Sequence, residues 1–275
     1  MVMLMANPLG AEPDEENNAS TDWLRSLAES GASEGQIVLL DQAIQGYAEA
    51  QYALAILFRG STGVPTDMNQ ARRWYHAAAA QGHTAALASL RQLANEGDGP
   101  AFYALGVLNR DGLGVPRDLA KARQAFLWAS EAGHIAALFA AADMLLNGSG
   151  GTTDIDAAHA AYEQVVSLCQ SALKKGGGQD YSDIFATDIR AGAQYWIANL
   201  YLQGGGGLER NAAAASLWFA DAANSGLGSA QYELGRLYLQ GRGVPLDREQ
   251  ALAWLEDAAA QGAEGAAEEI ARIKN

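Results

Sequence analysis

The chain has 275 residues and a formal net charge of −14, with 18 lysines and arginines against 32 aspartates and glutamates. This charge disfavours nucleic acid and anionic membrane surfaces, because their phosphates repel carboxylates, and it permits a basic protein partner. The single cysteine, Cys169, excludes an intramolecular disulfide and is interpreted as a small buried apolar residue. No stretch reaches the ~18 apolar residues that a membrane span needs.

Residues 1–20 are expected to be a disordered tail or the remnant of a signal sequence. An apolar start is followed by an acidic, polar stretch, and no basic residue precedes Arg25. Two alternatives stay open: a cytoplasmic protein that starts at Met1, or a periplasmic or secreted protein with residues 1–11 as the end of its signal peptide. Residues 21–49 predict N-terminal capping helices at 21–30 and 35–49, each with apolar residues at helical spacing.

From residue 50 onward, one pattern recurs five times. Each unit has a lead aromatic on a first helix, a glycine-rich turn, a capping Asp or Asn, and an apolar stripe on a second helix. Glycine and proline end the first helix, and an Asp or Asn side chain caps the second, so each unit predicts a helix–turn–helix hairpin. The expected units are about 50–82, 98–133, 134–175, 191–226 and 227–262. The lead aromatics are Tyr52, Tyr103, Phe139, Tyr195 and Tyr232, and the caps are Asp67, Asp118, Asp154, Asn211 and Asp247.

A single hairpin cannot bury its apolar face, so stacking of the units into an α-solenoid is expected. Two segments interrupt the period: residues 84–95, which predict an extra helix, and residues 176–188, which predict an insertion loop. Each is either a binding element or a structural insertion. Residues 263–275 predict a C-terminal capping helix with Ile270 and Ile273 facing the stack.

The pattern offers no catalytic residues, metal ligands or cofactor site. His83 and His134 directly follow the glycine that ends a unit, so both are interpreted as structural positions of the repeat. The glycines at 204–207 lack the Lys-Ser/Thr of a phosphate loop and fill the turn position of the fourth unit. No His-x-x-x-His pair occurs, and one cysteine disfavours a zinc site.

The pattern resembles the Sel1-like repeat family, a relative of the tetratricopeptide repeats. The fifth unit carries the resemblance best. It reads Leu234-Gly235, Tyr238, Gly241-Arg242-Gly243-Val244, Asp247, Ala251, Trp254, Ala258-Ala259 and Gly262. The resemblance implies an all-α, right-handed solenoid with adaptor or regulatory roles, in bacteria sometimes as an immunity protein against a toxin. It does not imply an enzyme.

In solenoids of hairpins the first helices line a concave face on which partners commonly bind. Two columns of that helix vary in chemistry from unit to unit, as a surface fitted to one protein partner would. The candidate partner-binding residues are Ile56, Asp143, Trp196, Asn199, Glu233 and Arg236, with Tyr181 and Phe185 of the insertion loop. Trp196 either contacts a partner or packs against a neighbouring helix or the loop.

These observations predict a non-catalytic protein–protein interaction scaffold. An immunity or inhibitor protein that neutralises a secreted toxin is the alternative, favoured by the acidic scaffold, the possible secretory remnant and the two insertions. The sequence sets neither the partner nor the oligomeric state.

Overall fold

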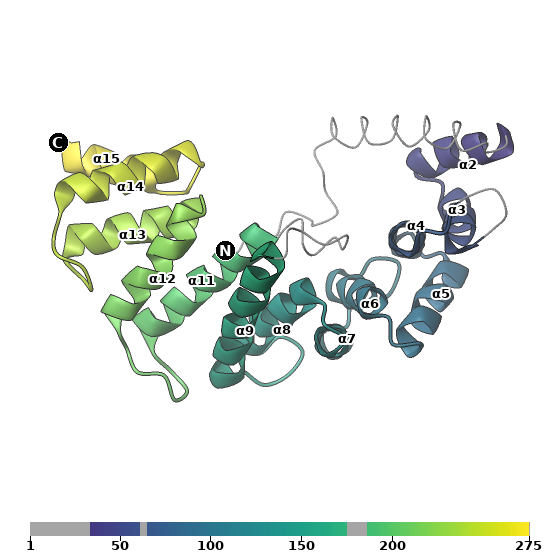
Figure 1. Cartoon of the computed structure of the whole chain (residues 1–275), viewed down its shortest axis with the longest axis horizontal. Helices are drawn as coiled ribbons and strands as arrows, with labels where there is room; N and C mark the ends of the chain where they lie inside the picture. The colour runs from purple at the N-terminus through teal and green to yellow at the C-terminus, as the bar shows by residue number, and fades with distance from the viewer. Residues whose placement is uncertain (1–33, 61–64, 175–185, 275) are drawn as a thin grey trace. The chain divides into compact units, whose positions relative to one another are not determined.

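The computed structural model describes residues 34–60, 65–174 and 186–274, and it divides into two compact units, Met1–Arg117 and Asp118–Asn275. In these ranges the chain forms thirteen helices, and the only extended pairing is an isolated bridge between Gly205 and Leu208. Each helix packs on the next one within its unit (Figure 1). The structure thus confirms the all-α class and a Sel1-like solenoid of hairpins.

The first unit contains five described helices. They are α2 (Glu34–Ile44), α3 (Ala48–Gly60), α4 (Met68–Ala80), α5 (Thr84–Asn95) and α6 (Gly99–Asp111). Besides the consecutive pairs, α4 also contacts α6, so that α4, α5 and α6 pack on one another. Fully buried Leu54, Tyr75, Leu90 and Leu108 bring α3 to α6 into one core.

The second unit contains eight described helices. They are α7 (Leu119–Glu131), α8 (Ile135–Asn147), α9 (Ile155–Lys174), α11 (Ala186–Gln203), α12 (Ala212–Asn224), α13 (Gly228–Gln240), α14 (Arg248–Ala260) and α15 (Ala266–Lys274). One apolar cluster joins α8, α9 and α11 around Tyr162 and Ile197. A second joins α11, α12 and α13 around Phe219 and Leu234. Helix α11 contributes to both clusters, which makes it the central element of this unit.

Side-chain capping explains where the second helices begin. The expected caps Asp67, Asp118, Asp154, Asn211 and Asp247 all accept a backbone N–H from the first turn of the helix that follows. Two helices that follow a unit-ending glycine, α5 and α8, are capped as well, whereas α13 has no side-chain cap. Here His83 and His134 accept the amides of Ala86 and Ala137 at Nδ1. The histidines therefore hold helix starts, as their repeated position indicated.

Three expected boundaries differ from the structure. The C-terminal helix expected from residue 263 begins at Ala266, after Gly265 with its left-handed φ of 83°. The helix expected over 35–49 ends at Ile44, and α3 begins at Ala48, because Gly46 adopts a left-handed φ of 96° that ends the helix. The loop expected over 176–188 ends by residue 185, because α11 begins at the buried Ala186. The expected helix 21–30 and the rest of that loop lie outside the described residues. Helix α5 occupies the span expected for the extra helix.

Candidate partner-binding surfaces

Five of the expected binding residues lie on three first helices of the second unit. Asp143 is on α8, Trp196 and Asn199 are on α11, and Glu233 and Arg236 are on α13. Ile56 lies on α3 of the first unit, where 42% of its surface is exposed. Tyr181 and Phe185 lie outside the described residues.

Trp196 is half-buried and packs against the cluster of α8, α9 and α11. Its ring meets that of Tyr195 edge to face, with centroids 5.6 Å apart. This contact supports the packing alternative for part of the indole, so Trp196 is not an isolated aromatic on a polar surface. A contact with a partner through the remaining exposed edge stays a prediction.

Glu233 and Arg236 form a pre-organised charged group on α13. The Arg236 Nη1 lies 3.2 Å from Glu233 Oε1, and the guanidinium carbon lies 5.7 Å from the centroid of the Tyr232 ring. Arg236 keeps 41% of its side chain exposed, against 23% for Glu233. An exposed pair of this kind adds little to stability, so its fixed geometry is available for recognition.

Tyr195 connects this group to α11. Burial raises the pKa of the Tyr195 phenol, hydrogen bonding to the Asn199 side chain acts in the opposite direction, and the negative charge of Glu233 raises the pKa further. Glu233 is therefore close enough to the Tyr195 phenol for its charge to act there. Trp196 and Asn199 lie on α11, and Glu233 and Arg236 lie on α13. We call these four residues the α11–α13 surface.

Asp143 has a role inside the fold. It accepts a hydrogen bond from the hydroxyl of Tyr162, which is fully buried between α8 and α9. Burial raises the pKa of Tyr162 well above its usual range, and the charge of Asp143 and the hydrogen bond act in the same direction. The Tyr162 hydroxyl thus stays protonated at any physiological pH and remains a hydrogen-bond donor to Asp143.

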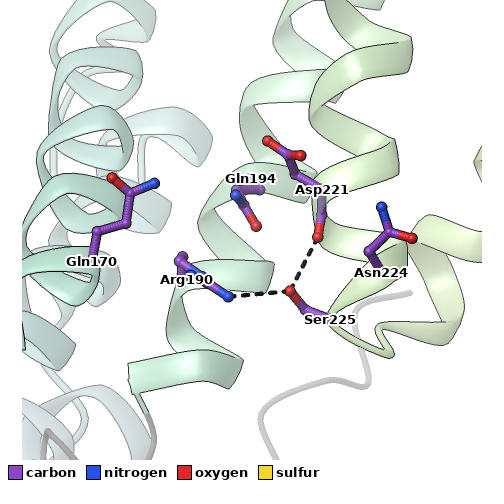
Figure 2. A pocket seen from close by; sticks show the side chains of 6 residues that line it. All are labelled: Gln170, Arg190, Gln194, Asp221, Asn224 and Ser225. Carbon is purple, nitrogen blue, oxygen red and sulfur yellow. Dashed lines mark hydrogen bonds between the residues drawn. The ribbon is translucent and has the colours of Figure 1, made fainter. Parts of the chain in front are cut away.

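A polar pocket of about 340 Å³ lies between α9, α11 and α12 (Figure 2). All of its lining residues are polar or charged: Gln170, Arg190, Gln194, Asp221, Asn224 and Ser225. The Arg190 Nη2 donates to Ser225 Oγ at 3.4 Å, and Ser225 Oγ donates to the backbone carbonyl of Asp221 at 3.0 Å. None of these residues was singled out from the sequence.

Two buried polar atoms at this pocket lack a hydrogen-bond partner: Nε of Arg190 and Oε1 of Gln194. Gln194 is only 4% exposed. An unpaired buried acceptor or donor costs about 1–3 kcal/mol, so a side-chain rotation that turns these atoms toward a partner in the pocket would be favoured. The sequence signal was available, since glutamine directly precedes the lead tyrosine in three units, as Gln51, Gln194 and Gln231.

An internal carboxylate already binds the glycine-rich turn of the fourth unit. The Gly207 amide donates to the carboxylate of Asp156 at 2.8 Å, so an internal carboxylate occupies the position that a phosphate oxygen would take. Among residues 34–60, 65–174 and 186–274, no cluster of three His, Cys, Asp or Glu side chains could hold a metal ion. No helix in those ranges is long and apolar enough to cross a membrane.

Consecutive hairpins with a fixed pattern of caps and turns define a helical repeat protein of the tetratricopeptide-like type. The Sel1 repeat pattern matches residues 48–83, 100–134, 135–162, 191–227 and 228–262, which is more than half of the chain. The chain belongs to the Sel1 repeat family.

The comparisons with known proteins agree with this family. The chain is 29% identical over 149 residues to an exopolysaccharide production negative regulator of Rhizobium leguminosarum bv. viciae, a match that covers 53% of this chain and 52% of that protein. The match therefore spans about half the length of the curated relative. Among solved structures, a Sel1 repeat protein from Oxalobacter formigenes superposes with a TM-score of 0.53 at 22% identity, covering 84% of this chain and 78% of the other.

A second solved structure is a putative Sel1 repeat protein from Klebsiella pneumoniae. It is 28% identical and covers 85% of this chain and 96% of the other, with a TM-score of 0.38. Sel1 repeat proteins generally mediate protein–protein interactions and are typically non-catalytic scaffolds.

Proposed function

We propose that this protein is a non-catalytic scaffold that binds a protein partner through the α11–α13 surface. The observation that carries this proposal is that two successive first helices, α11 and α13, carry a half-buried aromatic, an amide and a fixed charged pair. Aromatic residues and arginine dominate the energetics of protein interfaces. Membership of a family of interaction scaffolds supports the same reading.

The form of the interaction is proposed to be regulatory. The curated relative is described as a negative regulator of exopolysaccharide production, and a non-catalytic scaffold regulates by holding or displacing another protein. None of the relatives named above is described as a toxin inhibitor, and no contact among the described residues favours the inhibitor hypothesis. That alternative stays a prediction from the sequence.

The test is affinity capture of the partner from lysate of the protein's own host cells, with the full chain as bait. Two variants probe the surface. Trp196→Ala with Arg236→Glu removes the aromatic edge and reverses one charge. The exchange Glu233→Arg with Arg236→Glu keeps the ion pair and inverts its direction, so it tests recognition with little effect on the fold.

The matched control is Trp128→Ala with Arg248→Glu, which makes the same chemical changes on exposed positions of α7 and α14. A partner recovered by the wild type and the control, and lost with both surface variants at unchanged helicity, supports the proposal. Equal recovery by the surface variants would show that the partner binds elsewhere on the chain.

A further inference from the structure

The glutamine that precedes the lead tyrosine binds a backbone carbonyl in two of its three occurrences. The Nε2 of Gln51 donates to the carbonyl oxygen of Ala43 at 3.1 Å, and the Nε2 of Gln231 donates to that of Ala223 at 3.2 Å. Each acceptor lies eight residues earlier, in the last turn of the preceding helix. The repeat therefore uses this buried glutamine to hold a peptide group.

Gln194 is the third occurrence, and the insertion removes its acceptor. The residue eight positions earlier is Ala186, which lies in the first turn of α11 itself. Helix α11 has 18 residues, against 13 in α3 and α13, so its added turn occupies the stretch of chain that elsewhere ends the preceding helix. Among the residues that the structure describes, none replaces the missing hydrogen bond of the Gln194 side chain, and its Oε1 is buried without a partner.

Within the described ranges, the oxygen end of this amide is unpaired in Gln194 and in Gln231, and only the first unit pairs it. In the first unit, Gln81 at the end of α4 donates its Nε2 to Oε1 of Gln51 at 2.8 Å. The residue at the corresponding place after α12 is Ser225, whose shorter side chain bonds to Arg190 and to the carbonyl of Asp221 instead. The place that the Gln81 side chain fills in the first unit is thus an open polar pocket beside Gln194.

We propose that the pocket between α9, α11 and α12 binds a peptide group of a partner chain together with an adjacent carboxylate. The Gln194 amide supplies a donor for the peptide carbonyl, as Gln51 and Gln231 do within the repeat, and an acceptor for the peptide N–H. Arg190 supplies a guanidinium that forms no ion pair with any described carboxylate and has a free buried Nε, so a carboxylate is its preferred acceptor.

The size and lining of the pocket fit this ligand class. Its volume of about 340 Å³ lies at the lower end of the ~300–1,000 Å³ of small-ligand sites, which is room for one side chain and its adjoining peptide group. A lining of polar and charged residues disfavours an apolar ligand. One arginine in a chain of net charge −14 does not suit a nucleic-acid backbone.

The pocket and the α11–α13 surface lie on different sides of α11. Successive residues of an α-helix are about 100° apart, which places Gln194 nearly opposite Trp196. This inference rests on the proposed role of the chain as a protein-binding scaffold and adds a second contact with a stated chemistry. The two contacts are tested by different measurements on different residues.

The experiment is NMR titration of the isotope-labelled full chain, followed at the side-chain N–H signals of Gln194 and Arg190. Two probes carry the proposed chemistry: acetyl-aspartate N-methylamide, with a side-chain carboxylate, and acetyl-glycine, with a terminal one. There are two comparison probes. Acetyl-asparagine N-methylamide lacks the carboxylate, and acetate lacks the peptide group. We expect saturable shifts of both side chains below about 50 mM for one or both carboxylate probes, and at least about tenfold weaker binding of the comparison probes.

Three variants separate the pocket from general effects. Gln194→Leu removes the amide and places there the residue that the third unit has before its lead aromatic, as Leu138. Ser225→Gln restores the arrangement of the first unit and should fill the pocket. Both should weaken binding of the carboxylate probes about tenfold or more. Gln231→Leu is the matched control, which removes an equivalent amide outside the pocket and should leave binding unchanged.

The proposal is overturned if no carboxylate probe gives a saturable shift at Gln194 and Arg190. It is also overturned if acetate binds as well as the probes, or if Ser225→Gln binds them like the wild type. Stronger binding of acetyl-aspartate N-methylamide identifies an internal Asp or Glu of the partner, and stronger binding of acetyl-glycine identifies a chain terminus. These readings do not involve Trp196 or Arg236, so loss of the pocket proposal leaves the capture experiment on the α11–α13 surface unaffected.

Discussion

Arg72 on α4 and Asp98 before α6 form an ion pair that ties together two helices separated by the inserted α5. The Arg72 Nε lies 2.9 Å from Asp98 Oδ2, and both side chains are more than four-fifths buried. The other carboxylate oxygen of Asp98 accepts the backbone N–H of Ala101 at 2.8 Å and so caps α6. One residue thus starts a helix and fixes its position against α4, which is how the first unit accommodates an extra helix.

We expect Asp98→Ala to destabilise the first unit more than the loss of an ordinary cap. Removal of an N-cap costs about 1 kcal/mol, and loss of the part-buried ion pair should bring the total to about 2 kcal/mol. Asp67→Ala is the matched control: Asp67 caps α4 in the same unit through the amides of Asn69 and Gln70. Hydrogen exchange of the α6 amides in the full chain measures the difference, and equal losses in the two variants would contradict a role for the ion pair.

His76 should make the first unit sensitive to acid. Burial lowers the pKa of His76 from 6.5 to about 4, and the charge of Asp111 opposes this only in part. Between those values the unfolded chain binds a proton that the folded chain does not, so stability falls as the pH decreases from 6.5 toward 4. The loss at the acid end is about 3 kcal/mol, from about 1.4 kcal/mol per pKa unit.

The variant His76→Leu isolates this effect, since Leu127 stands at the corresponding place of the next repeat. Carboxyl groups titrate alike in both proteins and cancel in the comparison. Chemical denaturation at pH 7.5 and at pH 5 should show a smaller loss of unfolding free energy in the variant, by about 2 kcal/mol. The same pH dependence in both proteins would show that His76 gains its proton freely in the folded state.

The hairpins could be predicted from the sequence because their signals are local. A capping residue such as Asp118 or Asp247 and the glycine-rich turn before it act within a few residues, and the structure uses both as expected. Of the misplaced boundaries, those at Gly46 and Gly265 also have a local signal, whereas the start of α11 depends on tertiary packing. The helix after residue 34 breaks where Gly46 takes a left-handed conformation, and α11 starts early because Ala186 is buried by its neighbours.

The candidate site was predicted only in part, because tertiary contacts decide which side chains are accessible. Column position alone placed Trp196 and Asp143 on a binding face, whereas packing half-buries the first and a hydrogen bond from Tyr162 engages the second. The pocket at Gln194 depends on α9, α11 and α12 meeting across about fifty residues of sequence. Its repeated glutamine is visible in the sequence, but the loss of its acceptor is not.

Asp143 should affect stability before it affects binding. Asp143→Ala removes the acceptor of the buried Tyr162 hydroxyl, and a buried donor left without a partner costs about 1–3 kcal/mol. Asn147→Ala is the control on the same helix, because Asn147 is exposed and bonds only to the backbone of Asp143, so its change should stay within about 0.5 kcal/mol. Thermal unfolding of the second unit measures both. A neutral Asp143→Ala would return this residue to the list of candidates for partner contact.

Gly243 should be the most sensitive glycine of the fifth unit, because two constraints act on it at once. Its φ of 76° disfavours a side chain, and a Cβ would collide with the carbonyl of Ala212 in the first turn of α12. Gly226 has only the first constraint, since its φ is 89° and a Cβ there would meet nothing within 4 Å.

We therefore expect Gly226→Ala to cost about 1 kcal/mol, the strain of a left-handed residue alone. Gly243→Ala should cost about 3 kcal/mol or more, because the turn must move away from α12 and loosen the packing of one hairpin on the next. Urea denaturation of the full chain and exchange of the α12 amides measure the two losses. Equal costs would mean that this turn is free to shift, and that the glycine is required there for backbone conformation alone.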